Sequence, residues 1–128
     1  MIVLDTHAWI WWRADPDRLS APVTRAVAGA DHVGISSISV WELGMLVRRG
    51  RLTLDRDVEQ WVRNALSGGR VSVLAPDADV ALAAALLDDE FPGDPADRLI
   101  YATARQAGAR LVTRDERIAR FDPARALW

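Results

Sequence analysis

The chain has 128 residues, of which half are hydrophobic and 27% are charged, and this composition is typical of one globular domain with its own core. It contains no cysteine, which excludes disulfide frameworks, zinc–thiolate sites and cysteine nucleophiles. All 16 basic residues are arginine, which excludes chemistry that needs a lysine, such as the phosphate-binding loop of nucleoside triphosphatases. The net charge of −2 argues against a general nucleic-acid coat protein.

The sequence carries no signal for membrane insertion or for division into domains. Asp5, His7 and Arg13 interrupt the N-terminal apolar stretch, so we expect neither a signal peptide nor a membrane span. The lack of cysteine suits a reducing compartment, and we expect a cytoplasmic protein. No linker, repeat or low-complexity tract is present, so we expect residues 1–128 to form a single domain.

Short runs rich in branched residues alternate along the chain with segments of helical apolar spacing. The strand-like runs are 2–4, 33–36, 71–74 and 111–113, with 126–128 as a possible last edge strand. The helix-like segments are 22–30, 39–49, 54–66, 78–87 and 95–108. Strands separated by helices pair in parallel through right-handed crossovers. The pattern therefore predicts an α/β protein, a three-layer α/β/α sandwich with a short, mostly parallel central sheet.

Four acidic residues adjoin the predicted strand ends, and they are Asp5, Glu42, Asp97 and Asp115. The first and last of them follow strands closely, and the other two are expected in the first turns of helices. In an open parallel sheet, ligands bind in the crevice at the carboxyl ends of the strands. We therefore expect these four carboxylates to share one pocket.

Helix capping explains each of these acids equally well when it is taken alone. Asp5 can cap a helix that begins at Thr6, and the pairs Ser39–Glu42 and Thr113–Glu116 have the spacing of capping boxes. Four crowded carboxylates, however, repel one another by roughly a few kcal/mol per pair, whereas a cap contributes about 1 kcal/mol. A cation bound among them resolves this conflict.

The available ligand types indicate which cation this is. The chain offers carboxylates and only two histidines, His7 and His32, so the site favours Mg²⁺, with Mn²⁺ as a plausible substitute, over Zn²⁺. A carboxylate-bound magnesium ion keeps several waters and neutralises charge on a phosphoryl group. Metal-assisted hydrolysis of a phosphodiester bond needs no lysine, cysteine or catalytic histidine, and it is the reaction class that this inventory of residues favours.

Four segments together resemble the motifs of a known family, and they are IVLDTHAW, SISVWEL, DPADRLIYATA and LVTRD. They are similar, in order and spacing, to the motifs of PIN domains, above all to the VapC toxins of bacterial type II toxin–antitoxin pairs. The resemblance implies an α/β/α sandwich and Mg²⁺-dependent endoribonuclease activity on RNA. It also implies a homodimer, neutralisation by a cognate VapB antitoxin, and assembly into larger toxin–antitoxin complexes.

The resemblance also implies roles for the motif residues. Asp5 and Asp97 are expected to bind the metal, and Asp115 to complete the site directly or through water. Glu42 is expected to orient or activate the attacking water. Thr113 is similar to a family position that supports the site by hydrogen bonding. Asp94, an additional acid, is interpreted as a helix cap.

Other residues near these motifs allow two interpretations each. Trp9 and Trp12 share one helical face and are assigned to the core or its rim. Trp11 points elsewhere and is free to stack on an RNA base or to receive an antitoxin segment. Arg98 either pairs with Asp94 or reaches the scissile phosphate.

The remaining arginines and one more tryptophan complete the expectations for the surface and core. Arg114, Arg117 and Arg120 are expected to form a basic border near the last acid. Trp61 is assigned to the core, whereas the resemblance to PIN toxins implies a dimer or antitoxin contact in this region.

Two alternative functions use the same acidic pocket. One is a receiver-like phosphoacceptor domain, but receiver domains resemble haloacid-dehalogenase-type phosphatases in needing a catalytic lysine, which this chain lacks. The other is a catalytically inactive PIN-like binding module, and the presence of all four motif acids speaks against it.

Overall fold

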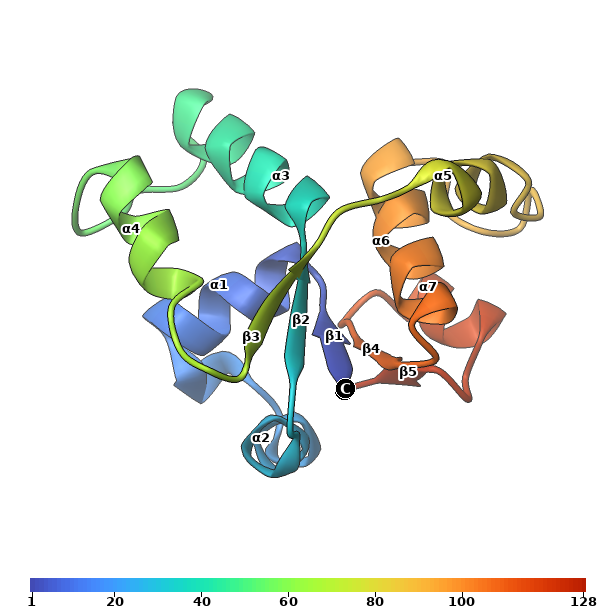
Figure 1. The fold of residues 1–128 in the computed structure, drawn as a ribbon, viewed down its shortest axis with the longest axis horizontal. Helices are drawn as coiled ribbons and strands as arrows, with labels where there is room; N and C mark the ends of the chain where they lie inside the picture. The colour runs from blue at the N-terminus through green and yellow to red at the C-terminus, as the bar shows by residue number, and fades with distance from the viewer.

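Five short strands form one sheet through the middle of the molecule (Figure 1). The computed structural model describes residues 1–128. The strands are β1 (Ile2–Leu4), β2 (Val33–Ser36), β3 (Val71–Leu74), β4 (Arg110–Val112) and β5 (Ala126–Leu127). Their order is β3-β2-β1-β4-β5 and every pair is parallel, which confirms the predicted sheet and its last edge strand.

Seven α-helices and one short 3-10 helix connect the strands. They are α1 (Thr6–Ala14), the 3-10 helix η1 (Pro16–Arg18), α2 (Ala21–Gly29), α3 (Ser37–Arg48), α4 (Val58–Ala65), α5 (Ala78–Ala85), α6 (Pro95–Gln106) and α7 (Glu116–Phe121). None of these helices is both long and apolar enough to cross a membrane.

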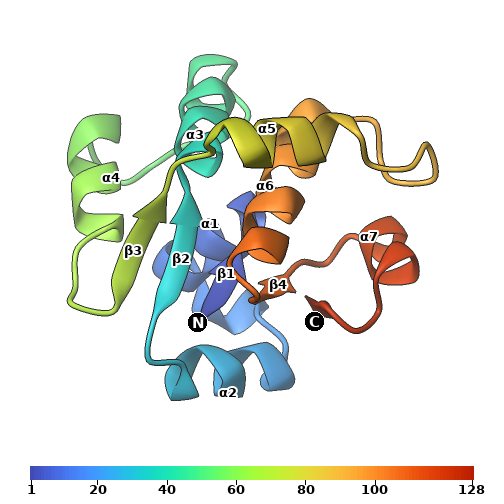
Figure 2. The ribbon, with the colours of Figure 1, turned by 45° about the vertical axis from the view of Figure 1, so that its right-hand side comes forward.

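The helices cover the two faces of the sheet in separate layers (Figures 1 and 2). Successive side chains of a strand point to opposite faces, so Leu4 packs in a core with α1 to α4, whereas Val3 packs in a core with α6 and α7. The first core includes a T-shaped pair of Trp9 and Trp61, with ring centroids 5.5 Å apart, and Trp12 packs against the same core. The core assignments of these three tryptophans are therefore confirmed.

Helix α5 does not cover the sheet but packs on α6. Val80 and Ala84 of α5 form a third, smaller core with Ala102 of α6. Both views show α5 lying against the upper part of α6 (Figures 1 and 2).

Several helices begin at residues other than those predicted, because capping side chains decide the first turn. Helix α3 follows β2 without a loop, since the Ser36 hydroxyl accepts a hydrogen bond from the Ile38 amide at 3.1 Å. Ser39 is therefore a buried helical residue, not a cap, and Glu42 lies in the second turn, not the first. Helix α4 begins at Val58, four residues later than predicted, because Asp57 caps it.

Helix α7 was not expected from the apolar pattern. It begins after Asp115, whose carboxylate accepts a hydrogen bond from the Arg117 amide at 2.8 Å, so Thr113 is not its cap. The Thr113 hydroxyl instead accepts a hydrogen bond from the Asp115 amide at 3.1 Å. Neither of the two capping boxes that the sequence spacing allows is therefore formed.

The strand order places a crevice between β1 and β4. From β1 the chain proceeds to β2 and β3 on one side of the sheet, and β4 and β5 are added on the other side. A parallel sheet binds ligands where the strand order reverses in this way, at the carboxyl ends of the strands. Asp5 leaves β1 and Thr113 leaves β4 at this point.

Candidate active site

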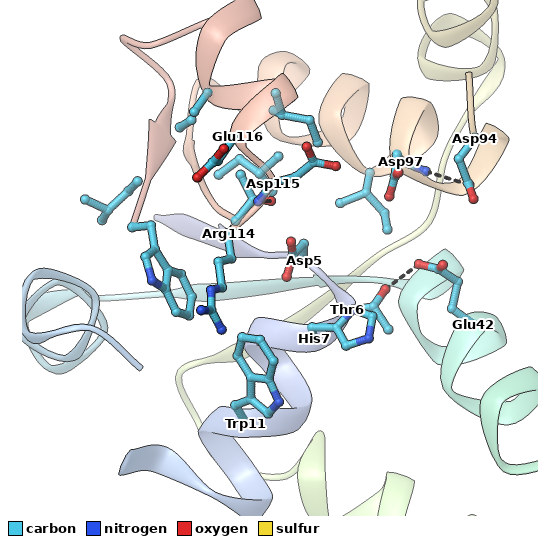
Figure 3. A pocket seen from close by; sticks show the side chains of 18 residues that line it. Asp5, Thr6, His7, Trp11, Glu42, Asp94, Asp97, Arg114, Asp115 and Glu116 are labelled. Atoms are coloured by element: carbon cyan, nitrogen blue, oxygen red, sulfur yellow. Dashed lines mark hydrogen bonds between the residues drawn. The ribbon is translucent and has the colours of Figure 1, made fainter. Parts of the chain in front are cut away.

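A pocket of about 870 Å³ lies at the carboxyl ends of β1 and β4 (Figure 3). All four carboxylates that the sequence analysis singled out line this pocket. Two further acids, Asp94 and Glu116, line it as well. The expectation that distant acids share one pocket is confirmed, and six carboxylates from four segments of the chain meet there.

Asp5 is held at the centre of the pocket by strand pairing and by the helix it caps. Its amide donates a hydrogen bond to the Val112 carbonyl at 3.0 Å, and its carboxylate accepts one from the Ala8 amide at 2.9 Å. Burial raises the pKa of Asp5, and the hydrogen bond from Ala8 partly opposes that rise. Asp5 therefore both caps α1 and lies in the pocket, so the two interpretations of this residue do not exclude each other.

The Glu42 carboxylate is hydrogen-bonded to Thr6, the first residue of α1. The Thr6 hydroxyl donates a short hydrogen bond to the Glu42 carboxylate, drawn as a dashed line in Figure 3, and it lies 3.1 Å from the Ser39 hydroxyl. Thr6 and Ser39 are both buried, so the hydrogen bond from Thr6 holds the Glu42 carboxylate in a fixed position. Burial raises the pKa of Glu42, the Thr6 hydrogen bond lowers it, and the neighbouring Asp94 raises it.

Asp97 projects into the pocket from the first turn of α6. Asp94 caps this helix, as the sequence predicts, and its carboxylate accepts hydrogen bonds from the Ala96 amide at 2.8 Å and the Asp97 amide at 3.3 Å. Burial raises the pKa of Asp97 to about 7, and repulsion from other carboxylates of the pocket adds to the rise. These carboxylates, from the largest contribution to the smallest, are Asp94, Glu42, Asp115 and Asp5.

Asp115 differs from the other three acids because an arginine neutralises it. Arg117 binds it with both arms of its guanidinium, at 3.2 Å from Nε to Oδ1 and 2.9 Å from Nη2 to Oδ2. This contact lowers the pKa of Asp115. Asp115 would have to release Arg117 before both of its oxygens were free for another ligand.

The carboxylates suit a hard divalent cation, although no three of them converge closely enough to form a finished coordination shell. The donor set consists of oxygens alone, and the repulsion that raises the pKa of Asp97 is the repulsion that a cation would relieve. A small hydrated ion that contacts two carboxylates and retains its other waters fits this arrangement. We call the four acids Asp5, Glu42, Asp94 and Asp97 the carboxylate end of the pocket.

The other end of the pocket is aromatic and basic. We call His7, Trp11, Arg114 and Trp128 the aromatic end; all four line the pocket. The ring centroids of His7 and Trp11 are 5.8 Å apart, and those of Trp11 and Trp128 are 5.7 Å apart. Figure 3 shows Arg114 reaching from the side of Asp5 toward Trp11.

The arginines near the motifs have different partners from those expected. Arg98 neither pairs with Asp94 nor enters the pocket, so both predictions for it are wrong. Its guanidinium instead donates hydrogen bonds, 3.1 to 3.3 Å long, to five backbone carbonyls at the end of α5 and in the loop before α6. Of the expected basic border, Arg114 lines the pocket and Arg117 pairs with Asp115. Arg120 lies in a separate hollow beside Arg117.

Sequence reasoning did not place His7 or Trp128 in the pocket. His7 is exposed and lines the pocket one helical turn before Trp11, and this spacing is a local signal that the two rings lie on one face. Trp128 carries no such signal. The pairing of β5 with β4, which places Leu127 opposite Val112, brings it to the pocket.

Comparison with known proteins gives consistent results. The family model described as PIN domain matches residues 2–123. The curated protein Ribonuclease VapC22 of Mycobacterium tuberculosis is 42% identical to the chain over 117 residues, which are 91% of this chain and 88% of that protein.

Two solved structures share the fold over nearly the whole chain. VapBC2 from Rickettsia felis, bound to a DNA fragment from its promoter, matches with a TM-score of 0.72 and 19% identity, over 99% of this chain and 98% of that chain. A toxin–antitoxin complex from Klebsiella pneumoniae matches with a TM-score of 0.70 and 22% identity, over 100% of this chain and 97% of that chain.

Proposed function

The chain belongs to the PIN domain family, and from this premise we propose that it is a divalent-metal-dependent endoribonuclease that acts as the toxin of a toxin–antitoxin pair. The observation that supports this most is the convergence of carboxylates from separate elements in one pocket, where burial and then repulsion from its neighbours raise the pKa of Asp97. The Mycobacterium relative is named a ribonuclease, which agrees with hydrolysis of RNA. We place this activity in the cytoplasm, where RNA is available.

We propose Mg²⁺ as the cation, held by Asp5 and Asp97, with Mn²⁺ as a substitute. When it is bound, such an ion supplies positive charge to the phosphoryl group and lowers the pKa of a coordinated water. Asp5 is fixed by its two backbone hydrogen bonds, and Asp97 by the capped first turn of α6, so the two carboxylates are preorganised. Asp115, which Arg117 neutralises, completes the site directly or through water.

Glu42 is the residue that we propose to orient the attacking water and to take up its proton. A general base works best when its pKa lies near the working pH, and burial moves the pKa of Glu42 upward from the ordinary glutamate range. The Thr6 hydroxyl holds one oxygen of Glu42, which leaves the other oxygen for the water. Thr113 supports the site by bonding the Asp115 amide.

We propose that a VapB-type antitoxin and a second copy of the chain are the protein partners. The solved structures with the same fold include toxin–antitoxin complexes, one of them bound to promoter DNA. Large apolar side chains are exposed on the outer helices, with Trp41 of α3 exposed by 59%, Leu82 of α5 by 61% and Leu86, directly after α5, by 74%. Exposed apolar surface of this kind is typical of protein interaction sites.

RNA cleavage with and without Mg²⁺ tests the proposed function. We expect the purified chain to cut RNA in Mg²⁺ and to stop when the metal is chelated. Asp5→Asn should lower the rate by at least roughly 10³-fold, the effect of losing several kcal/mol of metal stabilisation in the transition state. Asp31→Asn, an exposed acid in the bend before β2, is the control and should cut normally. An intact fold with no cleavage by the wild-type chain would favour the inactive PIN-like binding module instead.

A further inference from the structure

We propose that the aromatic end of the pocket is a stacking site for one unpaired base of the RNA, next to the phosphate that is cut. The inference rests on the proposed nuclease function and adds to it a subsite, built by side chains of this chain, for one base beside the cleaved phosphate. His7, Trp11 and Trp128 line this site. Arg114 lies at its border with the carboxylate end (Figure 3).

The two indoles form a corner that fits a flat ring. Trp11 and Trp128 have centroids 5.7 Å apart and planes inclined by 66°, so they do not stack face to face. Both line the pocket, and a base laid against the face of one indole would meet the other indole in an edge-to-face contact. His7, whose ring is inclined by 51° to that of Trp11, extends the aromatic lining.

The charges around this corner favour an anionic ligand. The Arg18 guanidinium lies 5.0 Å from the ring centroid of Trp11, and Arg114 lines the pocket beside it. Neither arginine belongs to any of the four salt bridges of the protein, so both charges are available to phosphates. Aromatic rings beside unpaired arginines are the combination that binds single-stranded nucleic acid.

The spacing along α1 relates the base site to the acids. Trp11 is six residues beyond Asp5, a rise of about 9 Å along the helix. This length is comparable to the reach from a phosphate to the base of a neighbouring nucleotide. A base stacked on Trp11 would therefore place an adjoining phosphate over the carboxylate end. A base within a duplex cannot offer its face in this way, so the site selects unpaired nucleotides.

A basic peptide fits the aromatic end less well than RNA does. Its positive side chains would meet Arg18 and Arg114 there, whereas the carboxylate end, with four acids, would attract them. RNA has the opposite preference, because its phosphates need cations and its bases need rings. The distribution of charge in the pocket therefore favours RNA at this end.

Binding of a fluorescein-labelled, unstructured RNA of about 12 nucleotides tests the inference, since that length covers a typical single-strand site. An Asp97→Asn background in Mg²⁺ keeps the RNA intact, and fluorescence anisotropy gives the Kd. We expect Trp11→Leu to weaken binding roughly tenfold, the usual loss of one stacked base, and Trp11→Phe to stay within about threefold. Trp41→Leu, which removes an exposed indole outside the pocket, is the matched control and should bind normally.

RNAs with a single abasic position, moved along the same oligomer, give the second arm of the test. For one position in this series, the abasic RNA should bind the Trp11-containing protein more weakly, by the same factor as the Trp11→Leu substitution. That abasic position should cause no further loss of affinity in the Trp11→Leu protein. Equal Kd values for Trp11→Leu and Trp41→Leu, or additive losses, would overturn the inference. Octa-arginine serves as the basic-peptide probe in the same assay. If Trp11→Leu weakened the binding of octa-arginine but not the binding of RNA, the inference would also be overturned. RNA cleavage by Trp11→Leu at the wild-type rate and KM would overturn this inference and leave the proposed function standing.

Discussion

The two ends of the pocket differ in charge, origin and support. The carboxylate end gathers acids from the end of β1, from α3 and from the start of α6, and burial together with repulsion among these acids raises the pKa of Asp97 to about 7. The aromatic end joins α1 to the C-terminal strand, and its arginine has no ion-pair partner. One end therefore lacks positive charge and the other lacks negative charge.

This difference indicates a division of work between the ends. A divalent cation satisfies the carboxylate end and brings the charge that phosphoryl chemistry needs. The phosphates and bases of RNA satisfy the aromatic end. Asp115 and Arg117, which neutralise each other, lie on the C-terminal side of the pocket and belong to neither end. Changes at the carboxylate end should therefore alter the rate of the reaction, whereas changes at the aromatic end should alter binding.

The largest expected effect separates the two ends by kinetics. Glu42→Gln keeps the shape of the side chain but removes the base, so kcat should fall roughly 10²- to 10⁴-fold with little change in KM. Trp11→Leu should instead raise KM. Glu59→Gln, an exposed glutamate of α4, is the matched control and should behave as wild type. Steady-state cleavage of one labelled RNA measures all three variants, and a Glu42→Gln protein with normal kcat would remove Glu42 from the chemistry.

A second prediction concerns the support of the carboxylate end. Arg98 bonds five carbonyls around the loop that precedes Asp94, and a lysine cannot reproduce this fork. Arg98→Lys should lower the free energy of unfolding by about 2 kcal/mol, measured by urea denaturation. Arg25→Lys on the exposed surface of α2 is the control. Equal stability of the two variants would show that these hydrogen bonds contribute nothing measurable.

The smallest expected effect is the pH dependence of the metal-free protein. Asp97 in the folded chain holds its proton up to about pH 7, whereas in the unfolded chain it loses it near about pH 4. Because the folded state binds more protons between these values, stability should fall as the pH rises from about 4 to about 7. The site is partly exposed, so we expect a loss of about 1 kcal/mol, not the full value of the shift.

Asp97→Asn should remove this part of the pH dependence and make the metal-free protein more stable than wild type at about pH 8. Asp79→Asn is the control, because Asp79 is also an acid in the first turn of a helix but lies outside the pocket. Urea denaturation in a chelator at about pH 5 and pH 8 makes the comparison. The same slope for all three proteins would show that Asp97 is an ordinary surface acid.

The sequence was sufficient to predict the sheet and the carboxylate end because both depend on local pattern. Alternation of strands and helices determines a parallel sheet, and an acid directly after a strand, such as Asp5, must lie at the carboxyl edge. The start of a helix was less predictable, since Ser36 and Ser39 are equally good caps by type, and only the direct junction with β2 selects Ser36.

The aromatic end and the role of Arg98 depend on long-range contacts that no local pattern encodes. Trp128 reaches the pocket only because β5 pairs with β4, and the partners of Arg98 are carbonyls of a loop whose shape the sequence does not state. Trp11 was recognised as lying beside the acids because its position on α1 follows from helical periodicity.

Titration of the metal-free protein with Mg²⁺ in a calorimeter, at about pH 8 and so above the pKa of Asp97, tests most directly whether the carboxylates are gathered for a cation. Our account predicts binding to wild type and to Asp79→Asn, and an affinity at least roughly tenfold lower for Asp97→Asn. The absence of binding to wild type, or an unchanged affinity in Asp97→Asn, would contradict it.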